Sequence, residues 1–87
     1  MYMKQSNVDS RFLAVYDTFV NEIFMFFFSK TWKRNLAKDL TQETFMKTWN
    51  DLSEGKIKGD MRSIHMSLKK NAESIITEKH SQISLAV

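Results

Sequence analysis

Apolar side chains recur at three- and four-residue steps in three separate segments of the chain, which is the spacing of one face of an α-helix. The first segment covers residues 10–28. Its apolar face consists of Phe12, Val15, Tyr16, Phe19, Val20, Ile23, Phe24, Phe26 and Phe27. We expect this helix to begin at Asp9 or Ser10, because the side-chain oxygen of either residue can accept a hydrogen bond from a first-turn amide.

The second segment, residues 32–50, carries two different rows of side chains. The first is a core-like row, made of Leu36, Ala37, Leu40, Thr44, Phe45, Thr48 and Leu52. A second row contains Asp39, Gln42, Met46 and Trp49. A row facing only solvent has no need of a methionine and a tryptophan, so this row predicts contact either with a neighbouring helix or with a partner molecule.

Residues 50–60 contain both glycines of the chain and are expected to form a loop. Asp60 is a suitable N-cap for a third helix over residues 61–79. The expected apolar face of that helix consists of Met61, Ile64, Leu68, Ala72 and Ile75. Residues 81–87 are too few to assign, and a short fourth helix at this end is an alternative.

The composition agrees with an all-α fold. The 87 residues include no proline, no cysteine and only two glycines, with 43% hydrophobic and 13% aromatic residues. We therefore expect one compact three-helix bundle over residues 1–87, without disulfides and in the cytoplasm. The longest uninterrupted apolar run, Ile23 to Phe28, is far shorter than the roughly 20 residues of a membrane span, so no membrane partner is expected.

The net charge of +3 is concentrated in one region. Residues 56–70 hold five cations and one carboxylate, while the rest of the chain is close to neutral. These cations belong either to a solvated surface or to a site that contacts phosphates. They are Lys56, Lys58, Arg62, Lys69 and Lys70.

Catalytic and metal-binding patterns are absent from the sequence. The two histidines, His65 and His80, have no metal-ligand spacing to each other or to a carboxylate, and no glycine-rich phosphate loop occurs. We expect no metal, no cofactor and no enzymatic activity.

One stretch of the second segment resembles a known family. Its residues fit the pattern D-L-x-Q-E-x-F-x-x-x-W through Asp39, Leu40, Gln42, Glu43, Phe45 and Trp49. This pattern is similar to region 2 of bacterial RNA polymerase sigma factors, in particular the extracytoplasmic-function group. The likeness extends more weakly to Phe12 and Tyr16 in the first segment and to Arg62 and Asn71 in the third.

The resemblance implies a protein that docks on the clamp helices of the largest subunit of core RNA polymerase. The residues carried over as polymerase contacts are Asp39, Gln42, Glu43 and Trp49, with Met46 added because it shares their helical face. The family also implies contact with single-stranded promoter DNA, to which Lys56, Lys58, Arg62, Lys69 and Lys70 correspond here. An anti-sigma regulator is a further implied partner.

The sequence departs from the family in its third segment, where Ile64 replaces the usual tryptophan or tyrosine and no Phe, Tyr or Trp follows Trp49. Base stacking is therefore not carried over, whereas attraction to phosphates is. The chain also lacks the family's second helical domain, so it is expected to be either an excised domain or a stand-alone protein. Two alternatives stay open: a polymerase-binding regulator that does not open promoters, and a helical protein that self-associates as a homodimer.

Overall fold

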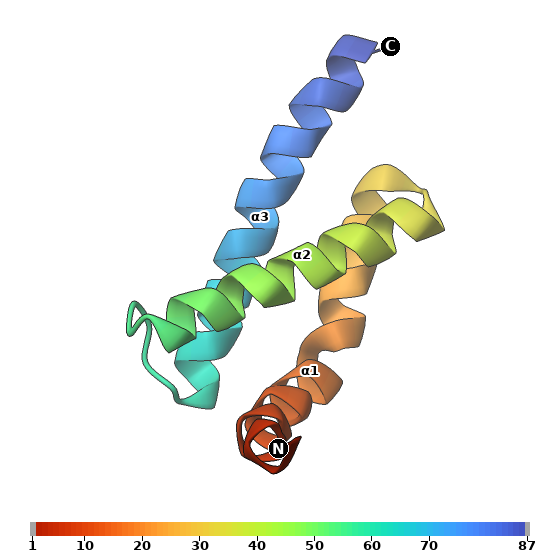
Figure 1. The fold of residues 1–87 in the computed structure, drawn as a ribbon. Coiled ribbons are helices and arrows are strands. Elements are labelled where there is room, and N and C mark those ends of the chain that lie inside the picture. Colours follow the sequence, from red (N-terminus) through yellow and green to blue (C-terminus); the bar gives the residue numbers. More distant parts are fainter. Residues whose placement is uncertain (1, 87) are drawn as a thin grey trace.

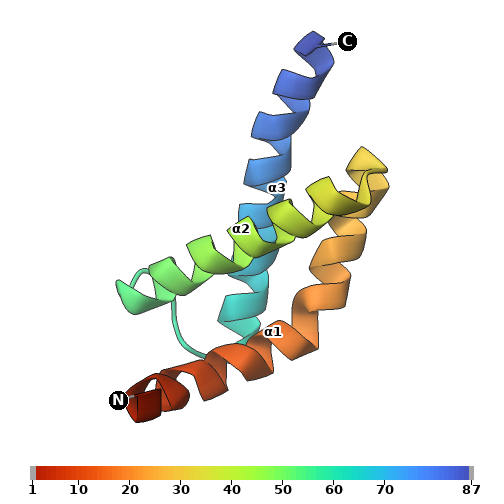
Figure 2. The ribbon, with the colours of Figure 1, turned by 45° about the vertical axis from the view of Figure 1, so that its right-hand side comes forward.

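The computed structural model describes the backbone of residues 2–86 and the side chains of residues 12–78. Within these residues, three helices follow one another: α1 (Tyr2–Thr31), α2 (Arg34–Ser53) and α3 (Met61–Ala86). Each pair of helices is in contact, and α2 lies across both α1 and α3 (Figures 1 and 2). The predicted all-α three-helix bundle is confirmed, and the described chain contains no fourth helix.

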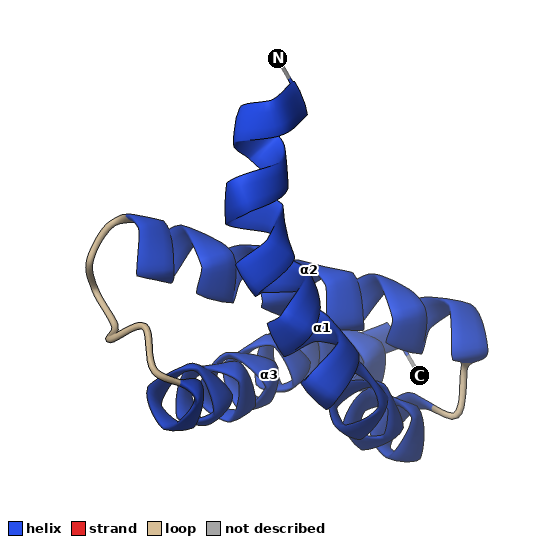
Figure 3. Ribbon diagram, turned by 90° about the horizontal axis from the view of Figure 1, so that it is seen from below, coloured by secondary structure: helices blue, strands red, loops and turns tan. Residues whose placement is uncertain are grey.

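The predicted helix ends were less accurate than the helices themselves. α1 begins at Tyr2, so Asp9 and Ser10 lie inside the helix and their predicted role as its N-cap is wrong. No proline or glycine precedes them, and the residues upstream are compatible with helix. α1 therefore extends further toward the N-terminus, and its first turns project beyond the other two helices in Figure 3.

The other two helices also extend past their predicted ends. α2 continues to Ser53, which shortens the loop that was expected to start at residue 50. α3 continues to Ala86 and includes most of the C-terminal segment that the sequence left unassigned. The side chain of His80 lies outside the described side chains.

The core lies where the three helices meet. Its buried hydrophobic residues are Val15, Ile23, Phe27, Ala37, Leu40, Phe45, Ile64, Leu68, Ala72, Ile75 and Ile76. These residues confirm the predicted inner faces of α2 and α3, except that Met61 is exposed at the first turn of α3. Ile64, the position where the sigma family has an aromatic residue, is part of this core.

Three buried threonines line the inner side of α2. The hydroxyls of Thr41, Thr44 and Thr48 donate to backbone carbonyl oxygens four residues earlier, at 2.7, 2.7 and 2.9 Å. Asn71 of α3 adds a bond across the interface by donating to the Thr48 hydroxyl at 2.8 Å. Among the described side chains, every buried nitrogen and oxygen has a partner, so this interior requires no ligand to satisfy it.

α1 contains a long apolar segment. Residues Phe12–Thr31 are long and apolar enough to cross a membrane by length and composition alone. Polar residues interrupt this segment, so its longest uninterrupted apolar run is short and did not reveal it. In the bundle the same residues supply Val15, Ile23 and Phe27 to the core, although 17% of the most apolar window is buried.

Candidate protein-interaction surface

The row of residues singled out on α2 lies on the outer side of that helix. Asp39, Gln42, Glu43 and Met46 are exposed, and Met46 keeps 66% of its surface accessible. This orientation follows from helix periodicity, because the opposite side of α2 is occupied by the buried core row. The structure therefore brings four of the five predicted polymerase contacts together on one accessible face.

Trp49, the fifth predicted contact, is half-buried. Its ring meets Phe12 of α1 edge-on, with 4.8 Å between ring centroids. Phe12 also meets Phe45 edge-on at 6.3 Å, so three aromatic rings from two helices form one cluster. Trp49 thus contacts a neighbouring helix, as one of the two sequence interpretations expected, whereas Met46 remains exposed.

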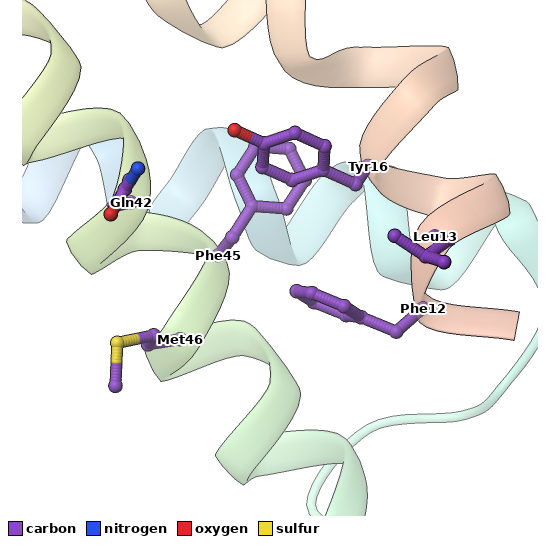
Figure 4. Close-up of a pocket in the computed structure, with 6 residues that line it drawn as sticks. All are labelled: Phe12, Leu13, Tyr16, Gln42, Phe45 and Met46. Atoms are coloured by element: carbon purple, nitrogen blue, oxygen red, sulfur yellow. The ribbon is translucent and has the colours of Figure 1, made fainter. Parts of the chain in front are cut away.

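A groove lies between α1 and α2 beside this cluster (Figure 4). Its volume is about 250 Å³. It is lined by Phe12, Leu13 and Tyr16 of α1 and by Gln42, Phe45 and Met46 of α2. The groove joins two of the predicted contacts to a set of apolar side chains from another helix.

Leu13 is the residue of this groove that sequence reasoning missed. It lies off the main apolar face of α1 and is 54% exposed. Phe12 and Tyr16 were assigned only to the core, yet both are partly buried and line the groove. A leucine outside the apolar face was the available signal, but the sequence alone does not show that α2 places Met46 on the opposite wall.

The predicted basic cluster is divided by the structure. Lys58 and Lys70 line one hollow at the start of α3, together with Ile57, Ser63, Met66 and Ser67. Lys56 pairs with Glu54 at 3.1 Å, and the hydrogen bond that the Lys56 ammonium donates to the Glu54 carboxylate raises the pKa of Lys56 above its ordinary value.

Lys69 lies on the other side of α3, in a hollow that it shares with Glu22 and Glu73. Consecutive helical residues point about 100° apart, so Lys69 and Lys70 face different sides of α3. The five cations thus do not line a single hollow, and their predicted contact with phosphates stays a prediction. Lys58 and Lys70 remain together, whereas Arg62, which is exposed, shares a face of α3 with Lys69 by helical spacing.

His65 joins α1 to α3 rather than adding to the basic surface. Its ring stacks on Phe19 with 4.3 Å between centroids and an interplanar angle of 7°. Its Nε2 lies 3.0 and 2.9 Å from the two carboxylate oxygens of Glu22. Among the described residues, no group of three or more His, Cys, Asp or Glu side chains is arranged to hold a metal ion.

No protein-family model, curated protein or solved structure matches this chain. The likeness to sigma region 2 therefore depends on the sequence pattern at residues 39–49, and the chain is assigned to no family. Independently of any family, the geometry defines a helical domain with an accessible, partly apolar face formed by α1 and α2.

Proposed function

We propose that this domain is a protein-binding module and that its partner is the core of bacterial RNA polymerase. The observation that carries the proposal is the exposure of Asp39, Gln42, Glu43 and Met46 along one side of α2, where a sigma-like pattern occurs. The fold itself leaves this row unused, since the core is built from the opposite face.

The chemistry of the face suits a protein partner. Met46 and Leu13 expose apolar surface on opposite walls of the groove, and Phe45 and Phe12 line it more deeply. Interfaces of this kind combine a desolvated apolar centre with a polar rim. Here Asp39, which is exposed, would contribute to the rim.

A helical partner fits this face best. A groove between two helices accepts the apolar side of a third helix, with anchors spaced by one helical turn. The clamp helices implied by the sigma resemblance are such a partner. Exposed carboxylates at Asp39 and Glu43 would set the register against cations of the partner helix.

Trp49 contributes to this site indirectly. Its contact with Phe12 supports the aromatic cluster that forms the wall of the groove. Replacing Trp49 would therefore change both the folded wall and any contact with the partner. A clean test has to use residues that the fold does not need.

The test is binding of core polymerase by the whole chain and by the double variant Gln42→Ala with Met46→Ala. Both side chains are exposed, so the fold should tolerate the change. Met66→Ala is a matched control, because Met66 is a 63% exposed methionine on α3, outside the groove. We expect at least a tenfold loss of affinity in the double variant and none in the control. Absence of binding by the wild type, or equal binding by the double variant, would contradict the proposal.

A regulator that occupies the sigma site without opening promoters is the second candidate. The division of the basic residues favours it, and so does the absence of Phe, Tyr and Trp from residues 50–87. Runoff transcription separates the two functions. A sigma-like domain supports initiation that depends on Lys58 and Lys70, whereas a regulator only inhibits initiation by another sigma factor.

Self-association through the same groove would compete with polymerase binding. Light scattering over a range of protein concentrations detects it without polymerase present. A mass that doubles with concentration, and that the Gln42→Ala and Met46→Ala variant prevents, would assign the groove to a second copy of the chain.

A further inference from the structure

A second surface lies where α1 ends and α2 begins, at the yellow corner of Figure 1. Its aromatic part is a continuous row. The rings of Phe24 and Phe28 stack with 5.9 Å between centroids, and Phe28 meets Trp32 at 5.6 Å. Trp32 is 76% exposed and the neighbouring Met25 is 57% exposed. Phe24 and Phe28 are half-buried against the core, so the exposed apolar surface of this corner is that of Trp32 and Met25.

Cations are concentrated along the sequence next to this apolar row. Residues 29–38 contain four cations and no carboxylate, namely Lys30, Lys33, Arg34 and Lys38, and all four are exposed. The first turn of α2 has no acidic residue. Lys33 and Arg34 lie at the N-terminus of α2 and oppose its dipole, so helix stability does not account for their position, whereas Lys30 in the last turn of α1 suits the dipole of that helix.

Trp32 has a strained backbone conformation. Its φ of 58° lies in the left-handed region, which is costly for a residue other than glycine. The Trp32 amide donates to the Phe28 carbonyl at 2.8 Å, and the Lys33 amide donates to the Thr31 hydroxyl at 3.2 Å. The chain thus maintains an unfavourable conformation that leaves an indole ring exposed between cations.

We propose that this corner, defined as Phe24, Met25, Phe28 and Trp32 with Lys30, Lys33, Arg34 and Lys38, binds the surface of an anionic membrane. Tryptophan favours the boundary between lipid headgroups and acyl chains, and Lys and Arg are attracted to anionic headgroups. Apolar side chains flanked by cations are the usual composition of a helix that lies on a membrane.

This proposal revises the sequence expectation that no membrane is involved. That expectation concerned spanning segments, whereas a peripheral contact needs only a small apolar surface and positive charge. The corner lies at the C-terminal end of α1, whereas the groove is lined by residues in the first half of that helix, Phe12, Leu13 and Tyr16. The two sites are therefore separate, and membrane binding does not depend on the function proposed above.

Single-stranded nucleic acid is the main competing ligand for aromatic and basic residues. Such sites stack successive bases on open aromatic faces. In the corner, Phe24 and Phe28 stack on each other, which leaves Trp32 as the ring with a widely exposed surface. Exposed Met25 adds apolar area that suits acyl chains and offers no stacking plane. The arrangement favours lipid.

The experiment is co-sedimentation of the whole chain with vesicles of phosphatidylcholine, with or without phosphatidylglycerol. We expect binding to the anionic vesicles and weakening by salt. The combined variant Lys33→Gln, Arg34→Gln and Lys38→Gln should bind roughly a hundredfold more weakly, because each cation near an anionic surface contributes about a factor of five. The matched control, Lys56→Gln with Lys58→Gln and Lys70→Gln, removes the same charge elsewhere and should bind nearly as well as the wild type.

Tryptophan fluorescence identifies the part of the chain that enters the lipid. A blue shift on adding anionic vesicles should persist in Trp49→Phe and disappear in Trp32→Phe. The proposal is overturned by a lack of vesicle binding, by equal losses in the two charge variants, or by a shift that depends on Trp49. Binding of a single-stranded oligonucleotide through Trp32 and Arg34, without vesicle binding, would overturn it in favour of nucleic acid.

Discussion

The loop between α2 and α3 and the corner between α1 and α2 both turn the chain from one packed helix to the next, but they do so with different local chemistry. In the loop, Gly55 takes the left-handed conformation with a φ of 75° after the end of α2. Asp60 then caps α3 by accepting a hydrogen bond from the Ser63 amide at 3.2 Å. Both choices follow the usual preferences of helix ends.

At the corner, the residues in the equivalent positions go against these preferences. Trp32 has the left-handed conformation in place of a glycine. Lys33 occupies the N-cap position of α2, with φ −123° and ψ 113°, and makes no capping bond through its side chain. Arg34 adds a cation to the first turn. The corner therefore departs from the stabilising preferences of helix ends at three positions, which is typical of functional sites. The loop follows those preferences, so the two connections can be compared within one protein.

The largest expected effects concern the two residues with a left-handed backbone, Gly55 in the loop and Trp32 at the corner. Gly55→Ala should destabilise the protein by about 1–2 kcal/mol, because a Cβ is disfavoured at this φ. An added Cβ there meets nothing within 4 Å, so the cost is conformational.

At the corner, Trp32→Gly should be more stable than Trp32→Ala by a similar amount, since both variants lose the same ring. Urea denaturation measures all three variants. Equal stability of the two Trp32 variants would show that the corner is not strained.

The second prediction concerns the N-cap of α2. Lys33→Asp should stabilise the protein by about 1 kcal/mol, because the extended backbone at this position lets the carboxylate accept a first-turn amide. Lys33→Ala is the control, since it removes the cation without providing a cap. Thermal unfolding compares the two. If both variants have the same stability, the absence of a cap is not a weakness of this helix.

The third prediction addresses the charge of the first turn. Arg34→Glu should raise stability by about 0.3–1 kcal/mol at low salt, because a carboxylate interacts favourably with a helix N-terminus. The gain should shrink in concentrated salt. The same change should weaken binding to anionic vesicles, so stability and lipid affinity should move in opposite directions. Loss of stability would contradict the view that the cation at this position is unfavourable to the fold.

Much of the loop, and little of the corner, could be predicted from the sequence. Asp60 was recognised as a cap because a short polar residue preceded a new apolar period, and the capping bond is present. The inner face of α2 was recognised for a similar reason, since Leu36, Leu40 and Thr44 follow one another at four-residue steps. Such local signals need no knowledge of the other helices. The same kind of signal failed at Asp9 because a polar residue inside a helix looks like a cap.

The remaining features depend on how the helices pack. Residues 29–38 are balanced by acidic residues elsewhere, so the charge of the whole chain did not reveal the corner. Lys69 and Lys70 are adjacent in sequence but lie in different hollows once α1 packs against α3. Leu13 joined the groove only because α2 places Met46 opposite it. Surfaces formed by two helices therefore could not be predicted from the sequence.

The smallest expected effect concerns Asp60, the capping residue at the end of the loop. Hydrogen bonds from the Ser63 side chain and then the Ser63 amide lower the pKa of Asp60 below its ordinary value of 3.8. A carboxylate with a lowered pKa stabilises the folded state above its ordinary pKa, and that contribution is lost as the pH falls through the folded-state pKa. Asp60→Asn keeps the capping oxygen and removes the titration. At neutral pH its stability should stay near that of the wild type, whereas below pH 3.8 the wild type should lose stability more steeply. Parallel pH profiles of the two proteins would mean that the Asp60 charge adds nothing to the cap.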